Sequence, residues 1–178
     1  MKKKFLALAL ALAFTLSLAA CGGKNAQTGG SGEESTPQKE VSLTDFYSAL
    51  LEETEWPELM NLTEDESMKE LLDSYYPGLS EISLKQCGVY TAAISAAVGE
   101  IALVEVENAG DVQKVQDIFQ ARIDYQVGDD SNPGGAWYPE TIEGWKNDSH
   151  IASNGNYVML AAGDSAADAV LRFNALFE

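Results

Sequence analysis

Histidine, cysteine and basic residues are scarce in this sequence. Its 178 residues include one His, two Cys and 11 Lys and Arg, against 28 Asp and Glu, so the formal net charge is −17. One His and two Cys are too few for a His/Cys zinc cluster, and so acidic a surface repels nucleic acid. A hydrophobic content of 46% still indicates a folded protein, and the length suits one folded domain. We therefore expect no nucleic-acid partner.

The residue types of nucleophilic catalysis occur in arrangements that do not suit it. Asp148, Ser149 and His150 are chain neighbours, and neighbours on a strand point to opposite faces, so we expect His150 to be an exposed strand-edge residue. Cys87 is expected to be a small buried apolar residue, although a Cys87–His150 nucleophile stays open. The sequence contains no Gly-x-Ser-x-Gly elbow and no Gly-rich phosphate loop. We assign no catalytic residue and no cofactor.

Carboxylates are abundant, but their number alone is not a specific signal. Residues 41–178 contain 25 Asp and Glu, so close pairs arise by chance, and a carboxylate-based hydrolase is a lesser alternative. Asp130 and Asn132 fit the first and third positions of a calcium loop, but Gly134 and Thr141 stand where an oxygen ligand and the closing Glu belong. We expect a turn-rich loop over residues 128–135 and assign no metal ligand.

The N-terminus has the features of an export signal. Lys2, Lys3 and Lys4 precede an apolar run over residues 5–18, which is too short to span a bilayer as a helix. Leu18-Ala19-Ala20-Cys21-Gly22 follows and resembles a bacterial lipobox. That resemblance implies that Cys21 carries acyl chains, such as palmitate, and becomes the N-terminus after cleavage. The alternatives are an ordinary secretory signal with a coincidental Cys and an uncleaved N-terminal anchor. The lipobox resemblance implies a lipoprotein on the extracytoplasmic face of the cell membrane, and the leader suits a Gram-positive host.

We divide the chain into a signal peptide (residues 1–20), a lipidated Cys21 with a disordered tether (residues 21–40), and a single domain (residues 41–178). Residues 22–40 contain one Ala and no larger apolar side chain, so their burial cannot offset the entropy of ordering them. Without the signal, 8 Lys and Arg remain against 28 Asp and Glu, a formal net charge of −20. An anionic bilayer does not attract such a chain, so the lipid on Cys21 must attach it.

The domain alternates between the helical and the strand period. Capping-box patterns at 42–45 and 63–66 predict two N-terminal helices, the second stopped by Pro77-Gly78. Strands are expected over 89–94, 101–106, 150–153 and 157–162, and helices after 108–111, over 138–146 and after an Asp164 cap. Two strand–strand–helix units predict an α+β fold, an antiparallel sheet covered by helices on one face.

Two details of the sheet follow from this pattern. Alternation in the second strand turns Ala102, Val104 and Val106 toward the core, and Glu105 and Glu107 toward water. The Ala-rich run over residues 91–97 is expected to be a central strand, because small side chains let a helix pack closely.

Several short motifs between residues 88 and 177 resemble one family of small bacterial lipoproteins, domain-of-unknown-function family 4358. The motifs are Gly99-Glu-Ile-Ala-Leu-Val-Glu-Val, Ala121-Arg-Ile-Asp-Tyr-Gln, Tyr138-Pro-Glu140, Gly155-Asn-Tyr-Val-Met-Leu and the closing helix. The resemblance implies an exported, lipid-anchored protein, and it assigns no catalytic residue.

A group of aromatic residues is the candidate binding surface. Trp137, Tyr138 and Trp145 lie within nine residues of each other beside a Gly/Pro loop. Such rings can stack on sugars or receive a partner's side chain, and packing against the sheet is the alternative. On the preceding helix, Arg122 either pairs with Asp124 or a nearby Glu, or fixes the loop at 138–139.

We predict a non-enzymatic binding or accessory module of the bacterial cell envelope, with an envelope protein as its partner. The alternatives are a cell-wall glycan binder that uses Trp137, Tyr138 and Trp145, and the carboxylate-based hydrolase.

Overall fold

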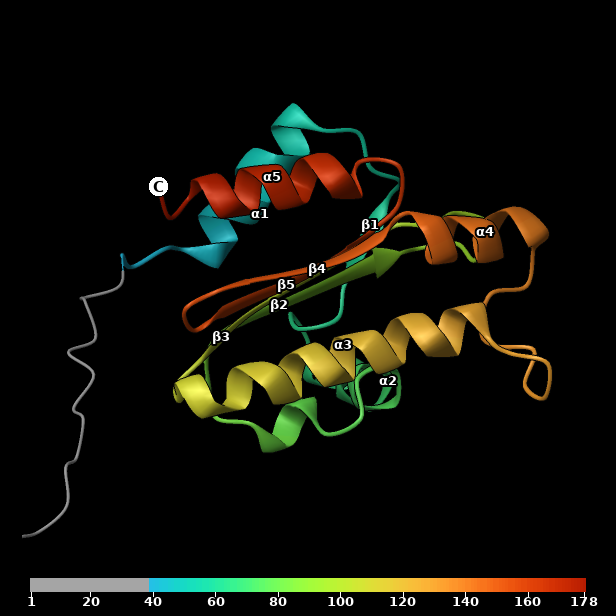
Figure 1. Cartoon of the computed structure of the whole chain (residues 1–178), viewed down its shortest axis with the longest axis horizontal. Coiled ribbons are helices and arrows are strands. Elements are labelled where there is room, and N and C mark those ends of the chain that lie inside the picture. The colour runs from blue at the N-terminus through green and yellow to red at the C-terminus, as the bar shows by residue number, and fades with distance from the viewer. Residues whose placement is uncertain (1–38) are drawn as a thin grey trace, which may run out of the picture. The chain divides into compact units, whose positions relative to one another are not determined.

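A five-stranded sheet with helices on both faces makes up the part of the chain that the computed structural model describes, residues 39–178 (Figure 1). The predicted signal peptide, Cys21 and most of the predicted tether lie outside these residues. The elements are α1 (Leu43–Glu53), β1 (Leu59–Asn61), α2 (Lys69–Tyr75), β2 (Leu84–Ala92), β3 (Glu100–Val106), α3 (Val112–Val127), α4 (Pro139–Asn147), β4 (Ser149–Asn154), β5 (Tyr157–Ala162) and α5 (Ala166–Ala175). None of the helices within residues 39–178 is long and apolar enough to cross a membrane.

The sheet is antiparallel throughout, with the strand order β1-β2-β3-β5-β4. The hairpins β2–β3 and β4–β5 join through their second strands, which pair from Glu100↔Ala162 to Glu105↔Tyr157. The predicted α+β class, with an antiparallel sheet built from two strand–strand–helix units, is therefore confirmed.

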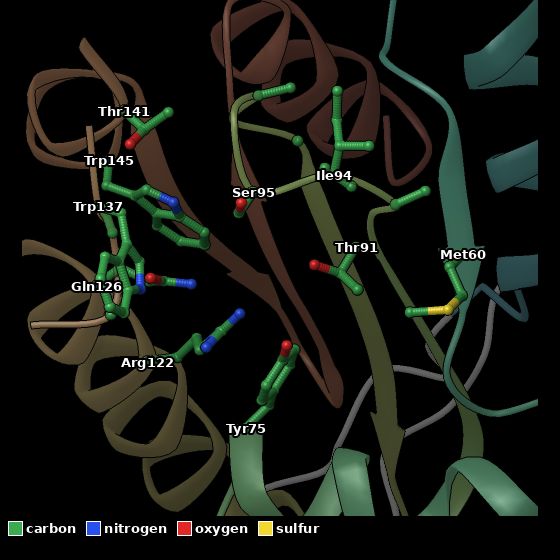
Figure 2. A pocket seen from close by; sticks show the side chains of 16 residues that line it. Met60, Tyr75, Thr91, Ile94, Ser95, Arg122, Gln126, Trp137, Thr141 and Trp145 are labelled. Atoms are coloured by element: carbon green, nitrogen blue, oxygen red, sulfur yellow. The ribbon is translucent and has the colours of Figure 1, made fainter. Parts of the chain in front are cut away.

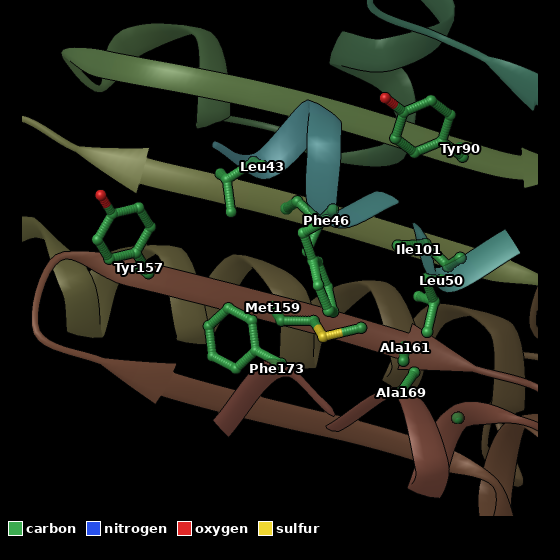
Figure 3. Packing of buried hydrophobic residues seen from close by; sticks show 12 residues of the cluster. Leu43, Phe46, Leu50, Tyr90, Ile101, Tyr157, Met159, Ala161, Ala169 and Phe173 are labelled. Atoms are coloured by element: carbon green, nitrogen blue, oxygen red, sulfur yellow. The ribbon is translucent and has the colours of Figure 1, made fainter. Parts of the chain in front are cut away.

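Helices cover both faces of the sheet, so the prediction of one covered face is wrong. Every residue of β3 and β5 is buried. In β3, Ile101 and Leu103 pack with α1 and α5 on one face (Figure 3), while Ala102 and Val104 pack with α3 on the other. Because α3 and α5 lie on opposite faces (Figure 1), the two strand–strand–helix units are not related as a simple repeat.

Glu105 is buried, although alternation predicted that it would face water; Glu107 is exposed as predicted. The Glu105 carboxylate accepts hydrogen bonds from Gln86 Nε2 at 2.6 Å and Lys85 Nζ at 3.1 Å. Gln86 also accepts from the Leu43 backbone N–H at 2.9 Å and donates to the Val41 carbonyl at 2.7 Å. The start of the domain therefore covers this face of the sheet, which is why a charged side chain is buried there.

The helix starts follow the capping prediction in part. Ser42 Oγ accepts the Asp45 N–H at 3.2 Å and begins α1, as predicted. The second capping box does not form: Asp65 instead caps a short 3-10 turn, Glu66–Met68, and α2 begins after it. At the last helix, Ser165 rather than Asp164 is the N-cap.

The β2–β3 turn lies where a strand was expected. β2 begins at Leu84 and ends at Ala92, so most of the Ala-rich run forms the turn that follows and not a central strand. Lys85, Gln86 and Gly88 interrupt the apolar pattern, so the sequence does not predict the early part of β2. β1, which the sequence did not predict, pairs with the end of β2 from Leu59↔Ala92 to Asn61↔Tyr90.

Candidate binding cavity beside a buried ion pair

A cavity of about 320 Å³ lies between the end of β2, the β2–β3 turn, α3 and the segment that leads into α4 (Figure 2). This volume is at the lower end of the range for small-molecule sites, roughly 300–1,000 Å³. The side chains labelled in Figure 2 are those of Met60, Tyr75, Thr91, Ile94, Ser95, Arg122, Gln126, Trp137, Thr141 and Trp145.

A buried ion pair forms the floor of this cavity. Glu100 begins β3 on the same face as Ala102, and Arg122 follows Phe119 by one turn on the buried side of α3. The Arg122 Nε and Nη2 atoms donate to the two Glu100 carboxylate oxygens, each at 2.8 Å. Their side chains are only 2% and 0% exposed, respectively. A bidentate contact of this kind fixes the relative orientation of the two side chains as well as their separation.

The Glu100 carboxylate has two further donors. Thr91 Oγ1 donates to Oε2 at 3.0 Å, and the Tyr76 hydroxyl donates to Oε1. Burial, and then the negative charge of Glu100, raise the pKa of Tyr76 well above its usual range, so this hydroxyl keeps its proton. With four donors on its two oxygens, Glu100 has no hydrogen-bonding site left for a substrate.

Arg122 lies among aromatic rings and still faces the cavity. Its Cζ is 4.0 Å from the centroid of the Tyr75 ring and 5.4 Å from that of Trp145, distances that suit cation–π contact. Burial alone would lower the pKa of the guanidinium, but the hydrogen bonds and charge of Glu100 more than offset this and raise it. Within residues 39–178, Nη1 makes no hydrogen bond, and Figure 2 shows the end of the side chain directed into the cavity.

Of the three predicted aromatic residues, two line the cavity and one does not. Trp137 is 85% exposed and lines the cavity mouth, whereas Trp145 is 5% exposed and lines its wall. Tyr138 is half-exposed and is not part of the lining. Two of the three predicted residues therefore meet at one cavity, with Trp145 also packed into the fold.

The loop before α4 holds Trp137 at the mouth. The Gly135 N–H donates to the Tyr125 carbonyl at 2.7 Å, and the Ala136 N–H donates to the Gln126 carbonyl at 3.1 Å. These bonds draw the loop back over the C-terminal end of α3. Gly128 begins the loop at φ +70°, and a Cβ there would lie 2.5 Å from the Asn132 carbonyl oxygen, so the turn requires glycine.

The oxygen-rich part of the same loop forms a turn. Asp129 Oδ1 accepts the backbone N–H groups of Ser131 at 2.7 Å and Asn132 at 2.8 Å, and also the Ser131 hydroxyl. These hydrogen bonds lower the pKa of Asp129. Across residues 39–178, no group of three or more His, Cys, Asp or Glu side chains is placed to hold a metal ion.

The nucleophile candidates lie apart from the cavity and from each other. Cys87 is on β2 and His150 on the edge strand β4, with β3 and β5 between them, so the Cys87–His150 hypothesis is wrong. Burial raises the pKa of the Cys87 thiol to about 11, which leaves little thiolate at neutral pH. His150 is half-buried rather than exposed, and the neighbouring Ser149 Oγ is buried with no hydrogen-bond partner in the described part of the chain.

The sequence pointed to Arg122 but not to its partner. Asp124 instead accepts a hydrogen bond from Gln120 at 2.8 Å, so the predicted Asp124 pair does not form. The predicted pairing of Arg122 with a Glu is correct, but its partner is Glu100 on β3 rather than an exposed residue near it on the helix. A signal was present: Arg122 continues the buried spacing of Val115 and Phe119, and Glu100 takes the inward position two residues before Ala102. A charged residue on each of two facing apolar stripes predicts a buried pair.

A family model described as "Domain of unknown function (DUF4358)" matches residues 57–163. The matched span holds the five strands described above, α2 to α4 and every residue that lines the cavity. The chain therefore belongs to this family, as its motifs had suggested. No curated protein and no solved structure gives a significant match to the chain.

Proposed function

We propose that this protein is a non-enzymatic binding module of the bacterial cell envelope, held on the extracytoplasmic face of the membrane by lipid on Cys21. The observation that carries the proposal is a cavity with a rigid, buried ion pair at its floor and exposed apolar side chains at its mouth. Trp137 is 85% exposed there and Ile94 is 63% exposed. Exposed apolar groups around a concave site are typical of a surface that a ligand covers.

The chemistry of the cavity favours binding over catalysis. Among residues 39–178, the lining contains no carboxylate, imidazole or thiol group. Glu100 lies behind the lining, and Arg122, Tyr76 and Thr91 already occupy its oxygens. A carboxylate-based hydrolase needs an acid and a base within reach of its substrate, and this cavity supplies neither.

The position of the cavity suits a protein tethered at its N-terminus. The chain enters the domain at Val41 and Leu43, which Gln86 holds near the start of β2, whereas Thr91 lies at the cavity near the end of that strand. Five residues of strand separate these points by roughly 17 Å. Figure 1 shows the entry of the chain and α4 at opposite ends of the sheet. A tether attached at the chain entry is therefore remote from the cavity within the domain.

A cell-wall glycan fits this cavity better than a protein surface does. A stable protein interface needs about 800 Å² on each partner and usually a broad apolar patch. Here Trp137 and Trp145 lie instead on one cavity that is sized for a single small group. Aromatic walls with a few polar groups between them suit a sugar ring, which has apolar faces and a polar edge.

Photocrosslinking in the native envelope tests this proposal. A photoreactive side chain would replace Ile94 at the cavity or, as a control, Leu171 on α5, which is similarly exposed at 68%. We expect wall glycan to be captured from position 94 and not from 171, and capture to be lost with Trp137→Ala. Equal capture from both positions, or capture of a protein that survives Trp137→Ala, would contradict the proposal.

A further inference from the structure

We infer that the cavity selects an uncharged, N-acylated sugar whose acyl carbonyl oxygen accepts a hydrogen bond from Arg122. This inference rests on the proposed function, and it names the ligand class of the same site. Three features of the cavity carry it: its charge, its unused hydrogen-bonding groups and its apolar surface.

The charge of the cavity is balanced before any ligand enters. Arg122 is the charged side chain of the lining, and Glu100 neutralises it from behind at 2.8 Å. A carboxylate or phosphate on the ligand would have to share Arg122 with Glu100, inside a domain whose surface is strongly acidic. A ligand ammonium group would meet the guanidinium directly. Both charged classes are therefore disfavoured, and a neutral acceptor is favoured.

The unused polar groups converge on the middle of the cavity. Arg122 Nε and Nη2 donate to Glu100, which leaves the Arg122 Nη1 group free to donate to a ligand. In Figure 2 the Gln126 amide and the Tyr75 hydroxyl point toward the same space, and neither makes a side-chain hydrogen bond within residues 39–178. The carbonyl oxygen of an amide is the neutral acceptor that matches a guanidinium donor, and Gln126 can both donate to and accept from sugar hydroxyl or amide groups.

The apolar part of the lining suits the rest of an N-acyl sugar. Met60, Ala92 and Ala97 line the cavity and offer contact for an acyl methyl group. Trp137, which is 85% exposed, offers its ring for the pyranose, and Trp145 adds apolar contact from the cavity wall. A volume of about 320 Å³ admits one such unit, so a longer chain would continue out past Trp137.

The experiment uses three β-1,4-linked sugar trimers that differ only at C2, which carries an acetamido group, a free amino group or a hydroxyl. The full chain, purified in a detergent without a sugar headgroup, is titrated with each by calorimetry. We expect the acetamido trimer to bind about tenfold more tightly than the other two, as the loss of one hydrogen bond to a charged group predicts. Trp137→Ala should weaken its binding by a similar factor, and Tyr138→Ala, the exposed neighbour outside the cavity, should not.

The outcomes separate this inference from the proposed function. Equal binding of all three trimers that depends on Trp137 would overturn the selectivity and leave the glycan-binding function standing. No binding of any trimer, together with no glycan crosslinked from position 94, would overturn both. Arg122→Lys, checked for folding by thermal unfolding, should remove the preference for the acetamido trimer. If that variant does not fold, the comparison of the three trimers on the unchanged chain still tests the selectivity for the acetamido group.

Discussion

Glu100→Gln is the substitution that tests the ion pair most strictly. It keeps the shape of the side chain and removes its charge, which leaves the Arg122 guanidinium buried without a counter-ion. The new amide group also places N–H donors opposite the donors of Arg122, Tyr76 or Thr91. Breaking a buried pair on one side costs about 3–5 kcal/mol. Domains of this kind have free energies of unfolding of about 5–15 kcal/mol, so the variant should lose a large fraction of its stability.

Urea unfolding, followed by far-ultraviolet circular dichroism, gives the required free energies. Arg122→Met should cost a similar amount, because it leaves the Glu100 carboxyl group buried without its partner. The double variant should cost at least about 2 kcal/mol less than the sum of the single variants, since no unpaired charge remains. A cost below about 1 kcal/mol for Glu100→Gln, or simple additivity in the double variant, would refute the view that the pair holds the cavity floor.

Three further substitutions test other parts of the structure. Trp137→Ala should change the free energy of unfolding by less than about 0.5 kcal/mol, because the side chain is exposed; a larger loss in urea unfolding would show that it is a packing residue. Gly128→Ala should destabilise the domain by about 1–3 kcal/mol and weaken ligand binding, because its φ is +70° and the loop carries Trp137; an unchanged Tm would contradict this. Stability should fall as pH rises from about 9.0 to about 11, because the unfolded Cys87 thiol loses its proton in this range while the folded thiol retains it, and Cys87→Ala should reduce that fall in urea titrations at each pH.

Local patterns in the sequence predict most of the helices and strands. They do not predict which face of the sheet each helix covers. β5 matches its predicted range, Tyr157–Ala162, because the Asn154-Gly155 turn and a run of apolar residues define it. The Glu105 side chain gives β3 the sequence pattern of a strand with one solvent-exposed face. The burial of Glu105 depends on hydrogen bonds from Gln86 and Lys85 of the adjacent strand. Which face a helix covers depends on contacts between distant segments, and the apolar period of a single helix does not contain that information.

The sequence predicts which aromatic residues lie at the site, because they are close together in the chain. It does not predict which distant residues pair there. Trp137 and Trp145 are close in the sequence and meet at the cavity, whereas Tyr138 turns away because successive residues point in different directions. Arg122 pairs with Glu100 across 22 positions and two elements. Such a pair is visible in a sequence only once α3 is known to pack on β3.

The indole N–H signals in a ¹⁵N NMR spectrum test the central claim, that the cavity is the ligand site. Trp137 and Trp145 line it, whereas Trp56 lies at a separate surface groove and donates its N–H to Thr54 Oγ1 at 2.7 Å, so it serves as an internal control. Addition of the acetamido trimer should shift the Trp137 and Trp145 signals and leave the Trp56 signal in place. A shift of the Trp56 signal alone, or no shift of any of the three, would contradict the account.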